Sequence, residues 1–176
     1  MGANIRIRMA VESDLSALPA IEDDAAHAFA EVGYGFCAGL PGQSVEALRL
    51  AMREGALLVA EAGEEGRLAG FAQVWRTREA AHLRELNVLR ASQKQGIGRA
   101  LLEGVALWAR ETGLSMVTLT TFRDVPWNAP WYARMGFEVV NAGELPDDLL
   151  HRLAPELALD RPEYPRVTMR MRLRVR

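Results

Sequence analysis

The chain has 176 residues, of which 49% are hydrophobic and 25% are charged, and its formal net charge at pH 7 is −2. This length fits one domain of residues 1–176 that can bury its own hydrophobic core. The nearly balanced charge argues against a nucleic-acid-binding surface and a basic membrane-surface helix, and the single cysteine, Cys37, excludes an internal disulfide.

The beginning of the chain predicts one strand and two helices. Residues 5–9 alternate apolar and polar side chains, as a half-buried strand does. Ser13 can cap a helix whose apolar residues continue at helical spacing to residue 25, and Pro19 within it predicts a kink or a late start. Residues 33–42 contain four glycines and a proline and are expected to form a loop. Residues 44–54 predict the second helix, with its apolar side chains on one face.

The middle of the chain predicts three strands and a long helix. Two apolar runs, 56–61 and 68–76, are separated by a short glycine-containing loop, which indicates a β-hairpin. Residues 82–89 predict the next strand. A glycine-containing turn at 93–98 leads directly into an amphipathic helix at 97–112.

The last third of the chain predicts three more strands and two shorter helices. The strands are expected at 116–121, 137–140 and 167–175, and the helices at 126–135 and 147–159. Because hairpins near the start give way to strands separated by helices, the chain is expected to form a mixed α/β sheet.

The most informative segment is the turn before the long helix, which reads Gln-Lys-Gln-Gly-Ile-Gly from residue 93. The first turn of a helix leaves backbone N–H groups without partners, and the helix dipole adds about half a positive charge there. Glycine lets the backbone approach a ligand closely. The turn therefore predicts a diphosphate site, to which Lys94 and Arg99 add charge. The alternative is that Gly96 and Gly98 only make a tight connection.

Two other phosphate-binding motifs are absent from the sequence. A Walker loop needs a Gly-Lys pair, and the chain has none. A dinucleotide fingerprint needs a third glycine where this chain has Leu101. The ligand is therefore expected to be neither a nucleoside triphosphate nor NAD.

The turn also resembles the coenzyme A motif of the GNAT superfamily of N-acetyltransferases, Q/R-x-x-G-x-G/A. A second resemblance lies about thirty residues further on, at 128–137, where the chain reads Asn-Ala-Pro-Trp-Tyr-Ala-Arg-Met-Gly-Phe. In the family, an asparagine turn and a short tyrosine-bearing helix precede Gly-Phe in this way. Two motifs in the right order are more specific than either alone, and the wider resemblance covers residues 5–175.

The resemblance implies an α/β (α+β) fold and a coenzyme A site. The expected sheet is mixed, mostly antiparallel and six- to seven-stranded, with helices on both faces and a central splay between the strands at 82–89 and 115–121. Acetyl-CoA is the implied co-substrate, and no metal is expected. The residues implied in cofactor binding are Leu86, Asn87, Val88, Gln93, Lys94, Gln95, Gly96, Ile97, Gly98, Arg99, Ala100 and Asn128.

Acetyl transfer to an amine needs a group that protonates the departing thiolate. Tyr132 is the candidate, because a phenol with a pKa near 10 carries its proton at neutral pH and the matching tyrosine is the general acid in many GNAT enzymes. The alternative is that Tyr132 only packs under the sheet.

The amine must also lose a proton, since a lysine-like amine with a pKa of about 10.4 is almost fully protonated at pH 7. Histidine is the side chain that most often exchanges protons near neutral pH, and some branches of the family place a base at the position of His82. Glu85 is the rival candidate. A chain of water molecules is a third option, and the alternatives for the two side chains are a strand-end surface residue for His82 and an ion pair for Glu85.

The acceptor is expected to be a small-molecule amine or an amine of a peptide or protein. In the resembled family the early helices and their loop select it, which makes Phe29, Glu31, Tyr34 and Phe36 candidate substrate-binding residues. No nucleic-acid or membrane partner is expected, and the family allows a homodimer. Since the chain shows no signal peptide and no run long enough to cross a bilayer, the expected location is cytoplasmic.

The sequence thus favours an N-acetyltransferase that transfers an acetyl group from acetyl-CoA directly to a primary amine. A non-catalytic acyl-CoA-binding or sensing domain on the same fold is the alternative. A nucleotide-binding protein of another class is a third hypothesis, which preferential binding of ATP or NAD over coenzyme A would support.

Overall fold

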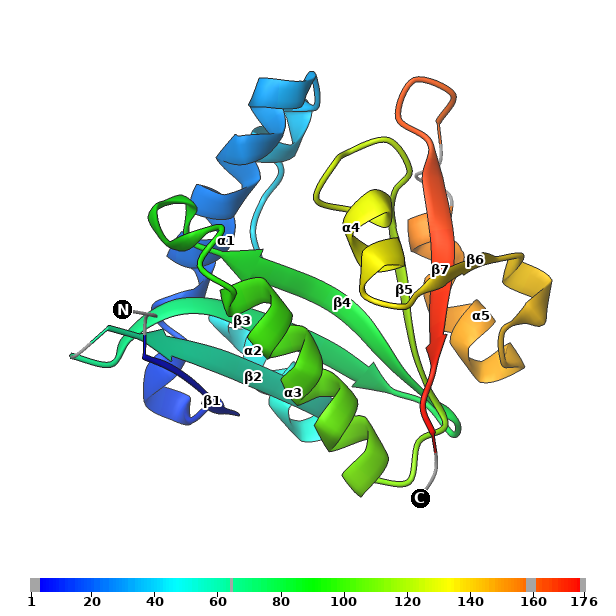
Figure 1. Cartoon of the computed structure of the whole chain (residues 1–176), viewed down its shortest axis with the longest axis horizontal. Helices are drawn as coiled ribbons and strands as arrows, with labels where there is room; N and C mark the ends of the chain where they lie inside the picture. The colour runs from blue at the N-terminus through cyan, green and yellow to red at the C-terminus, as the bar shows by residue number, and fades with distance from the viewer. Residues whose placement is uncertain (1–3, 64, 158–160, 175–176) are drawn as a thin grey trace. The chain divides into compact units, whose positions relative to one another are not determined.

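A computed structural model describes residues 4–63, 65–157 and 161–174. Its seven strands follow the order β1-β2-β3-β4-β5-β7-β6 across the sheet, with helices between them in the chain (Figure 1). The pairing between β4 and β5 is parallel, and that of β1 with β2, β2 with β3, β5 with β7 and β6 with β7 is antiparallel. The predicted mixed, mostly antiparallel sheet of six to seven strands is therefore confirmed.

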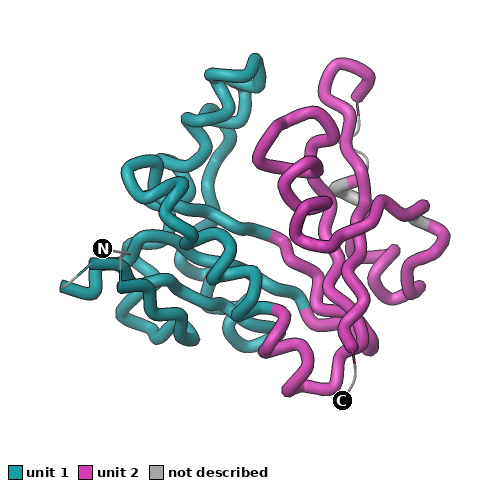
Figure 2. The backbone as a smooth tube through the Cα atoms, in the orientation of Figure 1, with its two compact units in different colours: residues 1–75, 85–105 teal, residues 76–84, 106–176 magenta. Residues whose placement is uncertain are grey.

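The chain divides into two compact units, coloured separately in Figure 2. Unit 1 comprises residues 1–75 and 85–105, and unit 2 comprises residues 76–84 and 106–176. Both β4 and α3 contribute residues to each unit. A single domain for residues 1–176 stays a prediction.

Unit 1 contains two complete strands, nearly all of a third, and two complete helices. They are β1 (Ile5–Met9), α1 (Leu18–Ala26), α2 (Val45–Glu54), β2 (Gly55–Ala62) and β3 (Arg67–Arg76, whose last residue lies in unit 2). Each lies within a few residues of its predicted position. Pro19 occupies the first turn of α1, so the predicted late start is confirmed. Ser44 caps α2 by accepting the Ala47 N–H at 3.1 Å.

The core of unit 1 follows the alternation of side chains along its strands. Leu57, Val59 and Phe71 face α1 and α2, where they join a buried cluster with Leu18 and Leu48. The opposite face lies under α3 (Ile97–Glu111), which is seen in front of β2 and β3 in Figure 1. Helices therefore cover both faces of the unit 1 strands.

The predicted loop at 33–42 contains helical turns. A 3-10 segment, His27–Val32, ends at Gly33, whose φ of 85° is left-handed. A second 3-10 segment, Gly35–Gly39, follows and leads toward α2. The predicted loop is therefore partly helical, because Gly33 ends the first 3-10 segment and the second forms within the range expected to be a loop.

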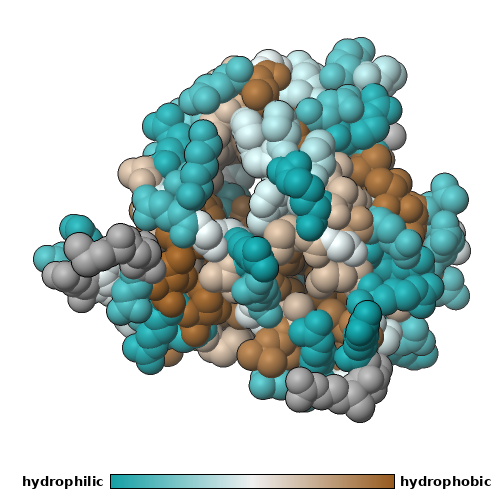
Figure 3. All heavy atoms as spheres, viewed as in Figure 1, coloured by the Kyte–Doolittle hydropathy of each residue, from teal (hydrophilic) through white to brown (hydrophobic). Residues whose placement is uncertain are grey.

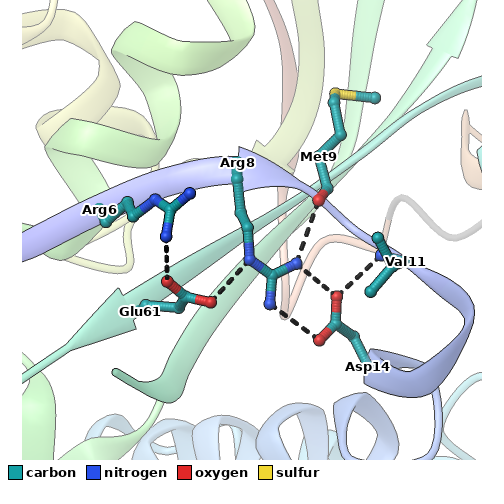
Figure 4. Close-up of polar contacts among 6 residues, drawn as sticks. All are labelled: Arg6, Arg8, Met9, Val11, Asp14 and Glu61. Carbon is teal, nitrogen blue, oxygen red and sulfur yellow. Dashed lines mark hydrogen bonds and ion pairs between the residues drawn. The ribbon is translucent and has the colours of Figure 1, made fainter. Parts of the chain in front are cut away.

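Arg8 on β1 lies in the centre of a polar network (Figure 4). Its guanidinium donates to both carboxylate oxygens of Asp14, at 2.6 and 3.0 Å, and to Glu61 on β2 at 2.6 Å. Asp14 also accepts the Val11 N–H at 2.8 Å. The hydrogen bond from Arg8 is the main cause that lowers the pKa of Asp14 below its ordinary 3.8, against the opposing effect of burial.

Unit 2 contains the remaining strands and the two short helices. They are the first residues of β4 (Ala80–Val88), then β5 (Met116–Phe122), α4 (Ala129–Arg134), β6 (Glu138–Val140), α5 (Asp147–Leu157) and β7 (Arg166–Arg172). The predicted ends at residues 159 and 175 lie outside the described residues. Unit 2 pairs Ala80–Leu83 of β4 with Met116–Leu119 of β5, and the last pair of this ladder is Leu83 with Leu119. The splay expected beyond that point stays a prediction.

The face shown in Figure 3 is mixed, with hydrophilic residues around small groups of apolar ones. Small exposed apolar groups of this kind are normal for a protein surface. Within the described ranges, no helix combines the length and the hydropathy that crossing a bilayer requires.

Candidate functional site: a helix N-terminal turn and a tyrosine-bearing helix

The turn between β4 and α3 lies in unit 1 and has an unusual backbone. A 3-10 turn, Arg90–Ser92, follows β4, and the Gln93 side chain donates back to the Val88 carbonyl at 3.2 Å. Lys94 and Gly96 then adopt left-handed conformations, with φ of 61° and 89°. Left-handed backbone at a non-glycine residue is uncommon and is often found at functional sites.

The turn presents a row of backbone N–H groups that the protein itself does not use. Among the described residues, the N–H groups from Gln95 to Arg99 donate to no backbone or side-chain acceptor. They lie at the N-terminus of the 15-residue helix α3, where the helix dipole favours an anion. This arrangement fits the diphosphate of coenzyme A. The N–H of Ala100, the last member of the expected row, donates to the Gly96 carbonyl at 3.0 Å, and its part in cofactor binding stays a prediction.

The positive side chains around the turn are not equivalent. Arg99 is paired with Glu103 one helical turn further along, at 2.8 Å, and both side chains are exposed. Exposed Lys94 forms no ion pair with any residue that the structure describes. An exposed ion pair contributes little to stability, so Arg99 can exchange Glu103 for a phosphate at small cost.

Asp24 on α1 holds the segment before the turn, a contact that the sequence did not predict. Its carboxylate accepts the Arg90 backbone N–H at 2.7 Å and the Arg90 guanidinium at 3.2 Å. The backbone hydrogen bond is the main cause that lowers the pKa of Asp24. The two residues are 66 positions apart, so no local pattern could have revealed the contact.

The end of β4 is packed closely against β3 at Gly70. A Cβ at this glycine would lie 2.6 Å from the Asn87 carbonyl oxygen, 3.2 Å from Val88 Cγ2 and 3.3 Å from Leu101 Cδ1. Leu86, Asn87 and Val88, which the resemblance implies in pantetheine binding, are all partly exposed. Only glycine therefore allows β3 to lie this close to the predicted cofactor strand.

We expect Gly70→Ala to weaken coenzyme A binding about tenfold and to lower the free energy of unfolding by about 1–3 kcal/mol, because the Asn87 backbone must move. Gly104→Ala is the control. Its Cβ would lie 2.9 Å from Ile7 Cγ2 and 3.1 Å from Leu58 Cδ2, so Ile7 must shift, but these contacts involve no residue of the cofactor strand. Calorimetry should show a normal coenzyme A affinity for Gly104→Ala, and a normal affinity for Gly70→Ala as well would contradict the prediction.

We also expect Gly96→Ala to weaken coenzyme A binding about 5- to 30-fold. A left-handed φ costs an alanine about 1–2 kcal/mol, which the chain can relieve by turning the unused amides away. Gly113→Ala is a matched control, since Gly113 has a similar φ of 77° and open space around it. Both variants should lose similar stability in urea unfolding, but only Gly96→Ala should lose affinity. Equal affinities would show that the turn does not bind the cofactor.

Tyr132 and Asn128 lie together in unit 2. The Asn128 carbonyl accepts the N–H groups of Trp131 and Tyr132, each at 2.9 Å, and so begins α4. The Tyr132 side chain is 8% exposed and contacts Trp131 and Phe137 edge to face, at centroid distances of 4.9 and 5.5 Å. These contacts fix the ring, which both a packing role and a catalytic role require.

His82 and Glu85 differ in accessibility. His82 is 0% exposed, and its Nδ1 lies 3.0 Å from the Thr118 hydroxyl of β5. The alternative of a strand-end surface residue is therefore wrong, because β4 and β5 enclose this position. Glu85 is partly exposed, and the Asn87 amide lies 3.5 Å from its carboxylate.

The four candidate substrate residues lie in unit 1, three of them on the two 3-10 segments after α1 and Tyr34 between these segments. Phe36 and Glu31 are exposed, whereas Tyr34 is buried and Phe29 is partly buried. The rings of Tyr34 and Phe36 lie 6.2 Å apart. No group of three or more His, Cys, Asp or Glu side chains that could hold a metal ion occurs among the described residues.

Comparison with known proteins gives one matching family profile and many solved structures of similar fold. The sequence profile of the acetyltransferase (GNAT) domain matches residues 53–139. Among solved structures, N-acetylglutamate synthase from Neisseria gonorrhoeae, solved with coenzyme A and N-acetyl-glutamate, is 21% identical with a TM-score of 0.73. That match covers 99% of this chain but only 36% of the synthase chain.

Two further structures match over nearly their whole length. A Mycobacterium tuberculosis protein solved with coenzyme A is 22% identical, with a TM-score of 0.74 and 96% and 99% of the two chains covered. The Escherichia coli enzyme that acetylates an alanine of a ribosomal protein is 19% identical, with a TM-score of 0.67 and 98% and 96% covered. At these identities the likeness shows a shared fold.

Proposed function

Because this chain belongs to the GNAT acetyltransferase superfamily, we propose that it transfers an acetyl group from acetyl-CoA directly to a primary amine. The observation that carries the proposal is the row of unused N–H groups from Gln95 to Arg99 at the start of α3. Backbone N–H groups without a partner at the start of a helix suit an anion such as the diphosphate of coenzyme A. Two structures with this fold were solved with coenzyme A bound, which supports the same cofactor here.

The proposed roles of the side chains follow from their surroundings. Tyr132 donates its phenolic proton to the coenzyme A thiolate as the C–S bond of the thioester breaks and the new C–N bond forms. A base takes the proton that the amine must lose. Glu85 suits this role better than His82, because it is partly exposed and His82 is fully buried. A water molecule relaying the proton to Glu85 meets the same need.

The class of acceptor is proposed from the fold and from its relatives. The names of two structural neighbours refer to an amino acid derivative and to an alanine of a ribosomal protein. An amino acid or the N-terminus of a peptide or protein is accordingly the acceptor that we propose first. A homodimer remains compatible with this function.

Release of free thiol from acetyl-CoA tests the proposal, with a panel of amino acids, peptides, lysine derivatives and simple amines as acceptors. Amine-dependent thiol release is expected, together with acetylated product of the corresponding mass. If no amine is acetylated but acetyl-CoA raises the melting temperature, the protein is a non-catalytic acyl-CoA-binding domain. Preferential binding of ATP or NAD over coenzyme A would overturn both proposals.

A further inference from the structure

One polar side chain is buried within an apolar stretch of β3. Gln73 is 3% exposed, and the residues before and after it, from 69 to 74, are buried alanine, glycine, phenylalanine and valine. Burying a carboxamide costs free energy unless its polar groups form hydrogen bonds. Each polar atom of Gln73 therefore needs a partner, in the protein or in a ligand.

The carbonyl end of this carboxamide is bound within unit 1. The Gln43 side chain donates from Nε2 to Gln73 Oε1. The backbone N–H of Gln43 in turn donates to the Glu22 carboxylate on α1, at 2.9 Å. These two contacts orient Gln73, because a planar carboxamide whose oxygen points to Gln43 must direct its NH₂ group elsewhere.

The NH₂ end is left for another partner. Within the described parts of the chain, Nε2 of Gln73 donates to no acceptor. Some side-chain atoms of the protein are both fully buried and without a partner, and Gln73 Nε2 is not one of them. Since this nitrogen has no partner in the described residues, it must be slightly exposed to solvent. A buried, oriented NH₂ group with two unused hydrogens is suited to an oxygen atom of a ligand.

The position of Gln73 in the sheet indicates which ligand would meet it. Gln73 shares a face of β3 with Phe71, which packs against α1 and α2, whereas α3 and its N-terminal turn lie on the other face. β3 is the neighbour of β4, the predicted pantetheine strand. Gln43 lies four residues after the end of the 3-10 segment that carries the candidate substrate residue Phe36. Gln73 therefore lies on the sheet face covered by α1 and α2, where the acceptor is expected, and not on the face that carries the predicted diphosphate site.

We propose that Gln73, held in place by Gln43, binds the acceptor and selects an amine that carries a carbonyl or carboxylate oxygen on the adjacent carbon. Amino acids and peptide N-termini have such an oxygen, which can accept a hydrogen bond from Nε2. A simple alkylamine has no atom for this contact. The inference rests on the proposed acetyl transfer and adds to it the residue that recognises the proposed acceptor and the oxygen atom by which it does so.

The test compares two acceptors that differ only in this oxygen-bearing group, alaninamide and isopropylamine. Gln73→Met keeps the approximate shape of the side chain and removes the carboxamide. Its ratio of kcat/KM for alaninamide over isopropylamine should fall about 3- to 10-fold from the wild-type ratio, as the loss of one neutral hydrogen bond predicts. The ratio within one variant cancels effects on folding and on the cofactor, and the Kd for coenzyme A should not change. Gln43→Met, which removes only the orienting contact, should shift the ratio in the same direction by less.

The outcomes separate this inference from the proposed function. An unchanged ratio in both variants, with an active wild type, overturns the role of Gln73 and leaves acetyl transfer intact. A wild type that acetylates other amines but not alaninamide overturns the substrate class. A wild type that acetylates no amine at all overturns acetyl transfer, and the inference with it.

Discussion

Tyr132→Phe is expected to lower kcat about 100- to 10,000-fold, with little change in the Kd for coenzyme A. This range is typical for the loss of a positioned general acid, because the thiolate then has to leave without a proton. Phenylalanine keeps the ring and its edge-to-face contacts with Trp131 and Phe137. The fold should therefore be preserved, and steady-state rates of thiol release measure the effect directly.

Tyr164→Phe is the control for removal of a phenol as such. Tyr164 lies in the segment between α5 and β7 and is outside both sequence motifs. This variant should keep the wild-type rate within about twofold, and both variants should unfold at wild-type temperatures. A Tyr132→Phe enzyme with more than a third of the wild-type kcat would show that Tyr132 only packs against its neighbours.

Arg8→Met is expected to lower the free energy of unfolding by about 3 kcal/mol. Removing one partner of a buried ion pair leaves the other charge uncompensated, at a cost of about 3–5 kcal/mol, and the 25% exposure of Arg8 places the effect at the lower end. Asp14 is only 7% exposed and would keep only the Val11 N–H as a partner. Urea unfolding followed by circular dichroism measures the change.

Arg6→Met is the matched control on the same strand. The Arg6 side chain is 74% exposed and approaches Glu61 only to 3.7 Å. Such surface pairs contribute about 0–1 kcal/mol, so this variant should unfold almost as the wild type does. If both substitutions lowered the free energy of unfolding equally, the Arg8 hydrogen bonds would not be what stabilises this part of the protein.

The same network predicts how stability depends on pH. The pKa of Asp14 is lowered in the folded protein, so its contribution is fully present above its unfolded pKa of about 3.9 and is lost as the pH falls through the folded pKa. The difference in unfolding free energy between wild type and Arg8→Met should therefore be constant near neutral pH and shrink below about pH 4. A difference that stays constant down to about pH 2 would show that Asp14 does not titrate with the pair.

Much of the fold could be predicted because its signals are local. The alternation of apolar and polar side chains predicted β1. The helical spacing of apolar side chains, together with Ser44 as N-cap, predicted α2. The turn before α3 was recognisable because glycines beside a strand end and a helix start are read directly from the sequence. The tyrosine-bearing segment was recognised by resemblance, and its helix α4 and the left-handed Gly136 after it agree with that reading.

The sequence by itself determined the elements, the glycine-containing turn before α3 and the family, because each depends on residues close together in the chain. Only the tertiary structure decided that His82 is buried beside β5, that Gly70 lies against Asn87, and that Gln73 Nε2 has no hydrogen-bond partner among the described residues. These facts depend on contacts between residues about 17 to 36 positions apart. Burial and hydrogen-bond partners are properties of packing, and alternation along one strand cannot show which neighbour covers each face.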